Sequence, residues 1–279
     1  MADTETTLVT FLLDRSGSMG QIWDETIGGF NVYLEKLQEG GEAIKFTLLQ
    51  FDTGGIDKCC VAEPVANVRP LDRDSYQPRG GTPLIDAAFK TIAAVEESLT
   101  KYDAVPKVII CIQTDGEENS SREHSWEELK RLVTEKIDKG WQFNFMGTGI
   151  DAYDQGARMG IASANTMSTG TGRTEVNASF RAAAASTVRY ACMLAPDTAY
   201  LMSERRAAGD RFADKYNLTG SAPSSQTQPL DLSKPAAPTK RGAPATRAAP
   251  TKPPAPTKRA AQTKRTARTK RQVVGDFSL

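Results

Sequence analysis

The chain has 279 residues, of which 39% are hydrophobic and 7% aromatic, and its formal net charge is +1. No apolar run approaches the roughly 20 residues of a membrane-spanning helix. The acidic start, MADTETTLVT, lacks the basic region of a secretory signal. The four cysteines have no disulfide or zinc spacing, so we expect reduced thiols and a cytoplasmic location.

The net charge is the average of two unlike parts of the chain. Residues 234–271 contain twelve Lys and Arg and no Asp or Glu, which gives this segment a charge of +12. Residues 1–233 contain the other 23 basic residues and 33 of the acidic ones, so they carry −10. The composition therefore predicts an acidic folded domain joined to a basic tail.

Short apolar runs between turn residues predict strands, and apolar residues at helical spacing predict helices. In chain order we expect a strand at 7–13, a helix at 24–38, strands at 44–51 and 57–65 forming a hairpin edge, a helix at 84–99, a strand at 108–112, a helix at 126–139 capped by Ser125, and a strand at 141–146. A short helix at 151–159, a strand at 161–167, a loop at 168–173 and a long helix at 174–194 follow.

Strands that alternate with helices predict an α/β fold. We expect a doubly wound, mainly parallel sheet with one antiparallel edge strand and helices on both faces. The folded domain is assigned to residues 1–200, one further helix to 201–219, and the tail to 220–279.

Polar residues follow the first predicted strand at every second position. The strand ends at Asp14, and Ser16 and Ser18 come next with Gly17 between them. Ligands of open α/β sheets bind beyond the carboxyl ends of the strands, and a carboxylate with two hydroxyls is a set of hard oxygen donors that suits Mg²⁺. The alternative for this loop taken alone is that Asp14, Arg15 and Ser16 cap the following helix.

Two later stretches add donors of the same kind. In residues 79–84, RGGTPL, two glycines let the backbone turn sharply and bring the Thr82 hydroxyl close to another loop. In residues 107–119, KVIICIQTDGEEN, a second buried strand is followed by Asp115. Adjacent parallel strands end at the same edge of a sheet, so both carboxylates are expected at that edge.

Asp14, Ser16, Ser18, Thr82 and Asp115 resemble, complete and in order, the Asp-x-Ser-x-Ser, Thr and Asp motif of the metal-ion-dependent adhesion site of von Willebrand factor A (VWA) domains. The resemblance covers about residues 5–195. The chain also resembles the small intracellular VWA proteins of bacteria and their phages, in which Gly-Thr-Pro-Leu and Thr-Asp-Gly-Glu-Glu occur, here at 81–84 and 114–118. A phage-encoded protein of this kind would lie in the host cytoplasm.

The resemblance implies a metal-dependent, adhesion-type module that binds protein. In the family, the residues matching Ser16, Ser18 and Thr82 ligate the ion directly, and those matching Asp14 and Asp115 act directly or through water. The expected ion is Mg²⁺, with Mn²⁺ or Ca²⁺ as alternatives. The ion recruits a Glu or Asp of a partner protein as its last ligand, and no membrane partner is expected.

Catalysis is not expected. Glu117 and Glu118 are interpreted as solvated loop carboxylates, and His124 as a surface residue before a helix. No phosphate-binding Gly-x-x-x-x-Gly-Lys is present. Cys111 and Cys192 are interpreted as small buried hydrophobic residues, and the adjacent cysteines 59 and 60 as ordinary reduced strand residues.

The tail repeats Ala-Pro-Thr-Lys-Arg or part of it, and its composition predicts disorder. Its charge favours sequence-independent binding to the phosphates of DNA or RNA, so the chain is alternatively a nucleic-acid-associated protein whose domain is a scaffold. Other interpretations are a solubilising linker or a tail that folds back on the acidic domain. Residues 273–279, VVGDFSL, are a docking peptide or a frayed end. The candidate nucleic-acid contacts are Lys240, Arg241, Lys258, Arg259, Lys264, Arg265, Lys270 and Arg271.

Overall fold

A six-stranded sheet lies at the centre of the computed structural model, which describes residues 6–40, 43–216 and 218. The strand order is β3-β2-β1-β4-β5-β6. All neighbours pair in parallel except β2 and β3, which are antiparallel. The strands are β1 (Thr7–Asp14), β2 (Ile44–Asp52), β3 (Gly55–Pro64), β4 (Lys107–Thr114), β5 (Gln142–Thr148) and β6 (Thr166–Thr169).

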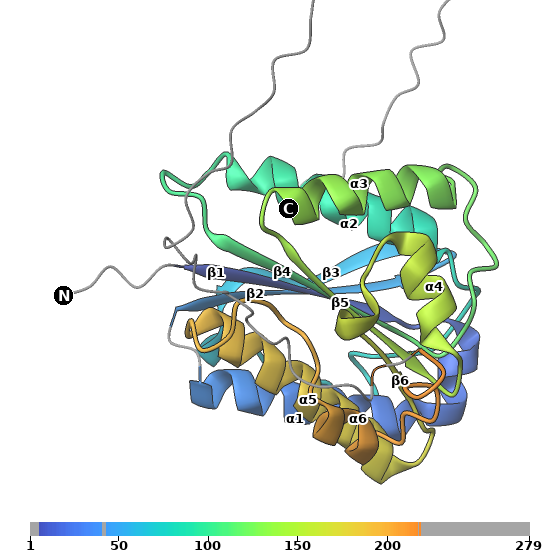
Figure 1. The fold of residues 1–279 in the computed structure, drawn as a ribbon. Coiled ribbons are helices and arrows are strands. Elements are labelled where there is room, and N and C mark those ends of the chain that lie inside the picture. Colours follow the sequence, from blue (N-terminus) through green and yellow to red (C-terminus); the bar gives the residue numbers. More distant parts are fainter. Residues whose placement is uncertain (1–5, 41–42, 217, 219–279) are drawn as a thin grey trace, which may run out of the picture. The chain divides into compact units, whose positions relative to one another are not determined.

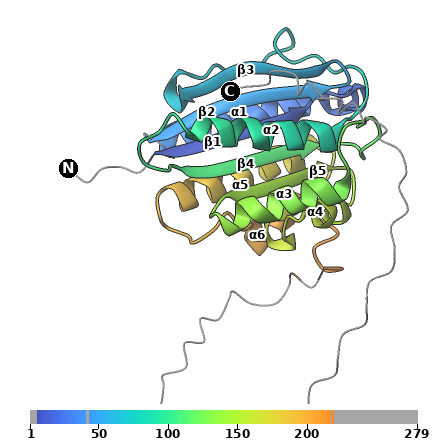
Figure 2. The ribbon, with the colours of Figure 1, turned by 90° about the horizontal axis from the view of Figure 1, so that it is seen from above.

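Helices cover both faces of this sheet (Figures 1 and 2). One face carries α1, α5 and α6, and the other carries α2, α3 and α4. This arrangement confirms the predicted fold class, a doubly wound and mainly parallel sheet with one antiparallel edge strand. The helices are α1 (Trp23–Gly40), α2 (Leu84–Leu99), α3 (Trp126–Asp138), α4 (Ala152–Met159), α5 (Arg173–Ala191) and α6 (Met202–Ala207).

The central strands are buried along almost their whole length because helices cover both faces of the sheet. In β1 all eight residues are buried. Phe11 packs against α1 and α5, with ring centroids 5.6 Å from Phe30 and 5.9 Å from Phe180, whereas Leu12 belongs to the apolar cluster under α2 and α3. Successive side chains of β1 therefore point to opposite faces of the sheet, and each face has its own hydrophobic core. Packing on both faces fixes the position of the end of β1.

The predicted strand at 161–167 is wrong in its position. Residues Ser163–Asn165 form a 3-10 turn, and β6 begins only at Thr166 and includes two residues expected in the following loop. Ile161 is 4% exposed and packs in the apolar cluster beside α4, with its N–H donated to the carbonyl of Gly156. Its apolar character therefore reflects the packing of α4 and not strand formation.

The helix expected at 201–219 is much shorter in the structure. Of the residues in this range that the structure describes, only Met202–Ala207 form an α-helix, and Gly209 then takes a left-handed backbone conformation with φ of 69°. Because this conformation favours glycine and ends helices, the chain turns away after two turns. The Ser125 cap is confirmed, since its hydroxyl accepts from the N–H of Glu128 in a capping box.

The cysteines agree only in part with the prediction. Cys111 is fully buried in β4, as expected. Cys192 is exposed, because it lies at the C-terminal cap of α5 and not on the helix face that packs against the sheet. Cys59 and Cys60 are free thiols on the edge strand β3, as expected.

The predictions for the tail lie outside the described residues. These include the disorder of 220–279, the terminal segment 273–279 and the candidate nucleic-acid contacts Lys240, Arg241, Lys258, Arg259, Lys264, Arg265, Lys270 and Arg271. None of the described helices is both long and apolar enough to cross a membrane.

Candidate metal centre

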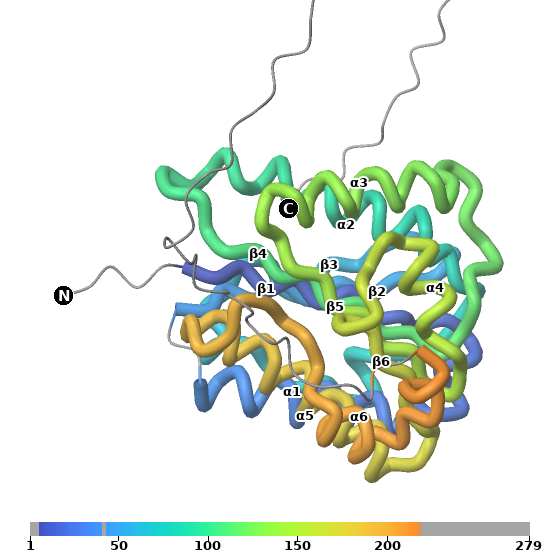
Figure 3. Tube along the Cα trace, in the orientation of Figure 1, coloured from blue at the N-terminus to red at the C-terminus, as the bar shows by residue number. Residues whose placement is uncertain are grey.

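The structure brings the five residues of the motif together beyond the ends of β1 and β4. The hydroxyl oxygens of Ser16 and Ser18 are 3.2 Å apart, and Ser18 donates to Oδ1 of Asp115 at 2.7 Å. A Cβ atom placed on Gly116 would lie 3.5 Å from both Ser18 Oγ and Thr82 Oγ1. Figure 3 shows the chain path by which β1, β4 and β5 run toward the same side of the sheet.

The loop after β1 does not use its hydroxyls as helix caps. Ser16 precedes a 3-10 helix, Gly17–Ile22, but its side chain makes no capping hydrogen bond. Instead, the backbone N–H of Ser16 donates to Oδ1 of Asp14 at 2.6 Å. The capping alternative is therefore wrong for Ser16, whose hydroxyl is directed to Ser18.

The loop that carries Thr82 is tied to the loop after β1 by main-chain hydrogen bonds. The N–H of Gly17 donates to the carbonyl of Gly80 at 2.9 Å, and that of Arg79 to the carbonyl of Arg15 at 2.7 Å. Gly80 has φ of 69°, a backbone conformation that residues other than glycine rarely adopt. Gly80 therefore allows the sharp turn that the sequence RGGTPL predicts.

Burial and charge single out the carboxylate of Asp14. Asp14 is fully buried, and burial raises its pKa to about 6 against the opposing hydrogen bonds from Thr114 and Ser16. Burial also raises the pKa of Asp115. Among the described residues neither carboxylate forms an ion pair. Two carboxylates without a cation in a partly buried site are costly, and a bound cation removes that cost.

The arginine within the loop does not supply this cation. Arg15 Nε donates to Oδ2 of Asp52 at 2.6 Å, and its Nη1 lies 2.6 Å from Oδ2 of Asp57. The side chain is 8% exposed, and the carboxylates that it contacts are those of Asp52 and Asp57. Its charge is thus neutralised on the β2–β3 side, where it does not oppose a cation beside Asp14.

Three supporting side chains were not found from the sequence. The Thr114 hydroxyl donates to Oδ2 of Asp14 at 2.6 Å, and the Tyr76 hydroxyl to the carbonyl of Asp14 at 2.7 Å. Gln155 of α4 is 4% exposed and donates to the carbonyl of Gly116 at 3.3 Å. Only Thr114 carries a sequence signal, because it is the strand residue next to Asp115.

The expectation that Glu117 and Glu118 are both solvated is wrong for Glu118. Glu117 is exposed, but Oε2 of Glu118 accepts from the N–H of Ile85 at the start of α2, at 2.8 Å. Its Oε1 accepts from the backbone of residues 120 and 121, and its own N–H donates to Gln155. Glu118 therefore holds the loop after β4 against α2 and α4. His124 stacks on Phe89 with ring centroids 3.7 Å apart.

The donor set suits a hard divalent cation. It consists of three hydroxyls and two carboxylates, and the described residues contain no group of three or more His, Cys, Asp or Glu that could hold a metal. Such oxygen donors fit Mg²⁺, and also Mn²⁺ or Ca²⁺, better than they fit zinc. Asp14, Ser16 and Thr82 are buried, Ser18 is exposed, and Asp115 is intermediate. The cluster is thus closed on the protein side and open to solvent at Ser18.

Comparisons with known proteins find similar structures but no similar sequences. No protein-family model matches the chain, and neither does any curated protein. The pilus adhesin SpaC from Lactobacillus rhamnosus GG, in an open conformation, has 15% identity and a TM-score of 0.54 over 68% of this chain and 31% of the adhesin. The von Willebrand factor type A protein from Catenulispora acidiphila has 14% identity and a TM-score of 0.48, over 66% of this chain and 43% of that protein.

A third match is the manganese-loaded TRAP protein of Plasmodium vivax, with 15% identity and a TM-score of 0.46 over 60% of this chain and 70% of TRAP. The chain thus spans less than a third of the adhesin SpaC. At these identities the similarity concerns the fold alone, a mainly parallel α/β sheet covered by helices.

Proposed function

We propose that this chain is an adhesion-type protein-binding module that captures an acidic residue of a partner through a Mg²⁺ ion. Asp14, Ser16, Ser18, Thr82 and Asp115 would hold the ion. The observation that supports this function best is a pair of carboxylates that form no ion pair with any residue the structure describes, and that lie beside three hydroxyls with one side open to solvent. The similar fold of SpaC, a pilus adhesin, agrees with a binding role.

The hydroxyl and carboxylate residues of the site would have different roles. The hydroxyls of Ser16, Ser18 and Thr82 are neutral ligands, and the aspartates act directly or through water. Asp115 also fixes the Ser18 hydroxyl, which donates to it at 2.7 Å. When bound, the ion supplies an electrophilic centre to which a partner carboxylate can add, because few charged groups surround it.

We infer a binding role and not a catalytic one. Metal-assisted hydrolysis needs a base close to the bound water. Glu118, the nearest half-buried carboxylate in the sequence after Asp115, uses both oxygens to accept hydrogen bonds from the N–H groups of residues 85, 120 and 121. Its role is to hold the loop.

The test combines metal-dependent stability with capture of a simple acid. Mg²⁺ should raise the melting temperature of the full-length protein, because a ligand that binds only the folded state adds about 2.7 kcal/mol at a hundredfold excess over its Kd. A fluorescent Gly/Ser peptide with a single glutamate should bind in Mg²⁺ and be released by EDTA, as measured by anisotropy. Thr82→Ala should weaken both effects.

Thr100→Ala is the matched control, because Thr100 lies at the other end of α2 and its exposed hydroxyl donates only to the carbonyl of Glu97. It should leave both effects unchanged. A melting temperature that does not respond to millimolar Mg²⁺ would count against the site. Peptide binding that EDTA does not change would count against capture through the ion.

The basic tail favours a second candidate function. The +12 charge of residues 234–271 is the footprint of a segment that binds nucleic acid, and in this case the domain would be a scaffold. The salt dependence of nucleic-acid binding, and its loss when the tail is neutralised, test this second function.

A further inference from the structure

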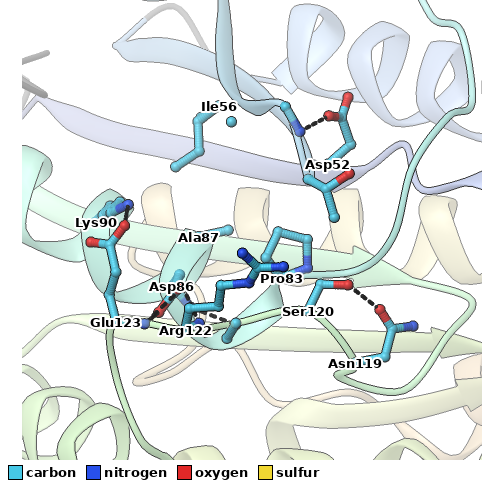
Figure 4. A pocket seen from close by; sticks show the side chains of 14 residues that line it. Asp52, Ile56, Pro83, Asp86, Ala87, Lys90, Asn119, Ser120, Arg122 and Glu123 are labelled. Atoms are coloured by element: carbon cyan, nitrogen blue, oxygen red, sulfur yellow. Dashed lines mark hydrogen bonds and ion pairs between the residues drawn. The ribbon is translucent and has the colours of Figure 1, made fainter.

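A polar pocket of about 490 Å³ lies beside the candidate metal centre. Its walls are the β2–β3 turn, the first turns of α2 and the loop at 119–123 (Figure 4). Pro83, which lines it, directly follows Thr82, and Asn119 accepts from the N–H of Thr82 at 2.9 Å. A peptide that reaches the candidate metal centre can therefore continue into this pocket.

Two of the acidic residues that line the pocket form ion pairs with arginine or lysine side chains. Asp52 Oδ2 accepts from Arg15 Nε at 2.6 Å and from Arg79 Nε at 2.9 Å. Glu123 pairs with Lys90, also in the lining, at 2.7 Å. These charges are already neutralised and do not decide which ligand the pocket attracts.

The third acidic residue of the lining, Asp86, accepts hydrogen bonds from backbone N–H groups. Its carboxylate accepts from the N–H groups of residues 122, 123 and 124, at 2.7, 3.2 and 2.9 Å. These hydrogen bonds engage both oxygens of the carboxylate. They also fix the backbone of Arg122 at the rim of the pocket.

Arg122 is the one charged residue of the lining whose side chain forms no ion pair or hydrogen bond with the described residues. Its side chain is exposed, and the described residues offer its guanidinium no ion pair or hydrogen bond. In Figure 4 this guanidinium is turned toward the centre of the pocket. The Arg122 guanidinium is therefore the cationic group of the lining that is left to contact a ligand.

We propose that this pocket binds a second carboxylate of the partner, held by Arg122, while the first carboxylate occupies the candidate metal centre. The inference rests on the proposed function and adds to it the class of ligand, a protein segment with two acidic side chains. The planar guanidinium presents paired N–H donors that match the two oxygens of a carboxylate. Arg122 would thus select among acidic partners, since a single carboxylate meets only the ion.

Synthetic peptides test this proposal on the full-length protein. Labelled Gly/Ser peptides carry either one glutamate or two glutamates at varied separations, and anisotropy gives their Kd in Mg²⁺ and in EDTA. At the best separation, the second glutamate should tighten binding to the wild type by about fivefold, the upper range for an exposed ion pair. Arg122→Gln should remove this gain and leave the Kd of the one-glutamate peptide unchanged.

Arg181→Gln is the matched control, because Arg181 is exposed on α5, on the opposite face of the sheet. It should keep the gain from the second glutamate. If no separation gives a gain, or if Arg122→Gln keeps it, the inference is overturned, while EDTA-sensitive binding of the one-glutamate peptide still supports the proposed function. If Arg122-dependent binding is instead insensitive to EDTA, the pocket stands and capture through the ion is contradicted.

Discussion

Asp52 is a single carboxylate that organises the loops beside the candidate metal centre. It is 2% exposed and accepts from Arg15 and Arg79, which belong to two different loops of the site. Although burial by itself raises the pKa of Asp52, the hydrogen bonds from Arg79, Gly54 and Arg15 bring it below its ordinary value of 3.8. Asp52 therefore favours the folded state in its ionised form.

Asp52→Asn should destabilise the protein, because it keeps the shape of the side chain but leaves Arg15 with only the exposed Asp57 as partner. We expect a loss of about 2 kcal/mol in the free energy of unfolding, measured in urea at neutral pH. Asp57→Asn is the control, since the side chain of Asp57 is 59% exposed. Its effect should stay within about 0.5 kcal/mol.

The pH dependence of this contribution follows from the lowered pKa. A carboxylate with a folded pKa below its unfolded value stabilises the fold above the unfolded pKa and loses this effect as pH falls through the folded one. The difference between wild type and Asp52→Asn should thus be constant above about pH 5 and shrink below pH 3.8, the ordinary pKa. A difference that grows in acid would contradict the assigned role of Asp52.

The sequence predicted the residues of the candidate site better than their supports. Asp14, Ser16 and Ser18 follow a strand within five positions, and Asp115 follows another strand, so local pattern and strand order are sufficient. Tyr76 and Gln155 reach the same loops from 62 and 39 positions away along the chain. Their approach depends on how the long loop before α2 and the helix α4 pack, which no local pattern encodes.

At the scale of elements, the predictions succeeded where one physical cause dominates. β1 and β4 are buried on both faces, and their continuous apolar runs reflect only that burial. Two predictions failed after α4: the strand at 161–167, where Ile161 packs beside α4, and the helix at 201–219, where the shorter α6 is held by polar contacts. Short elements stabilised by tertiary contacts have weak periodicity, so sequence reasoning cannot place their ends.

Arg205 is the polar contact that holds α6. It is 1% exposed, and its guanidinium donates to the carbonyls of Ser163 and Ala164 at 2.9 and 2.7 Å and to the Tyr153 hydroxyl at 2.6 Å. It also lies 3.4 Å from Oδ2 of Asp210, whose side chain is fully buried. One side chain thus joins α6 to α4 and to the segment before β6.

Arg205→Met should destabilise the protein strongly, because it retains the apolar stem but leaves the buried Asp210 carboxylate without its ion-pair partner and removes one donor from each of the carbonyls of Ser163 and Ala164. We expect a loss of about 3–5 kcal/mol in the free energy of unfolding, as for other buried pairs that lose one partner. Arg206→Met is the control at the next position, where the side chain is exposed. Equal urea midpoints for the two variants would show that Arg205 is not the anchor of α6.

At the scale of the whole molecule, strand order decides where the candidate site forms. β1 lies between β2 and β4, so the chain leaves β1 toward one side of the sheet and returns later on the other. Such a switch point opens a crevice at the carboxyl ends of the strands. Asp14 is the last residue of β1 and Asp115 directly follows β4, so both carboxylates lie at the carboxyl ends of neighbouring strands, as the sequence predicted.

In the whole molecule, residues 1–233 carry a net charge of −10 and the tail segment 234–271 carries +12. Nucleic acid and the acidic surface of the protein itself compete for the same lysines and arginines. The phosphate polymer should win at low salt, because its charge density is higher and binding releases its condensed counterions. Exposed charge pairs weaken as the Debye length falls to about 8 Å at physiological salt. We therefore expect binding to DNA or RNA with little sequence preference.

A salt titration on an arbitrary duplex tests this expectation with the full-length chain. If half of the twelve tail charges engage, the slope of log K against log salt should be about −5, which is about a thousandfold loss between 50 and 200 mM. Replacing the twelve Lys and Arg of residues 234–271 by Gln should abolish binding, whereas exchanging Lys and Arg for each other should preserve it. Binding that survives neutralisation would place the contact in the folded domain. No binding by the wild type at about 50 mM salt would leave the tail as a linker or as a partner of its own acidic domain.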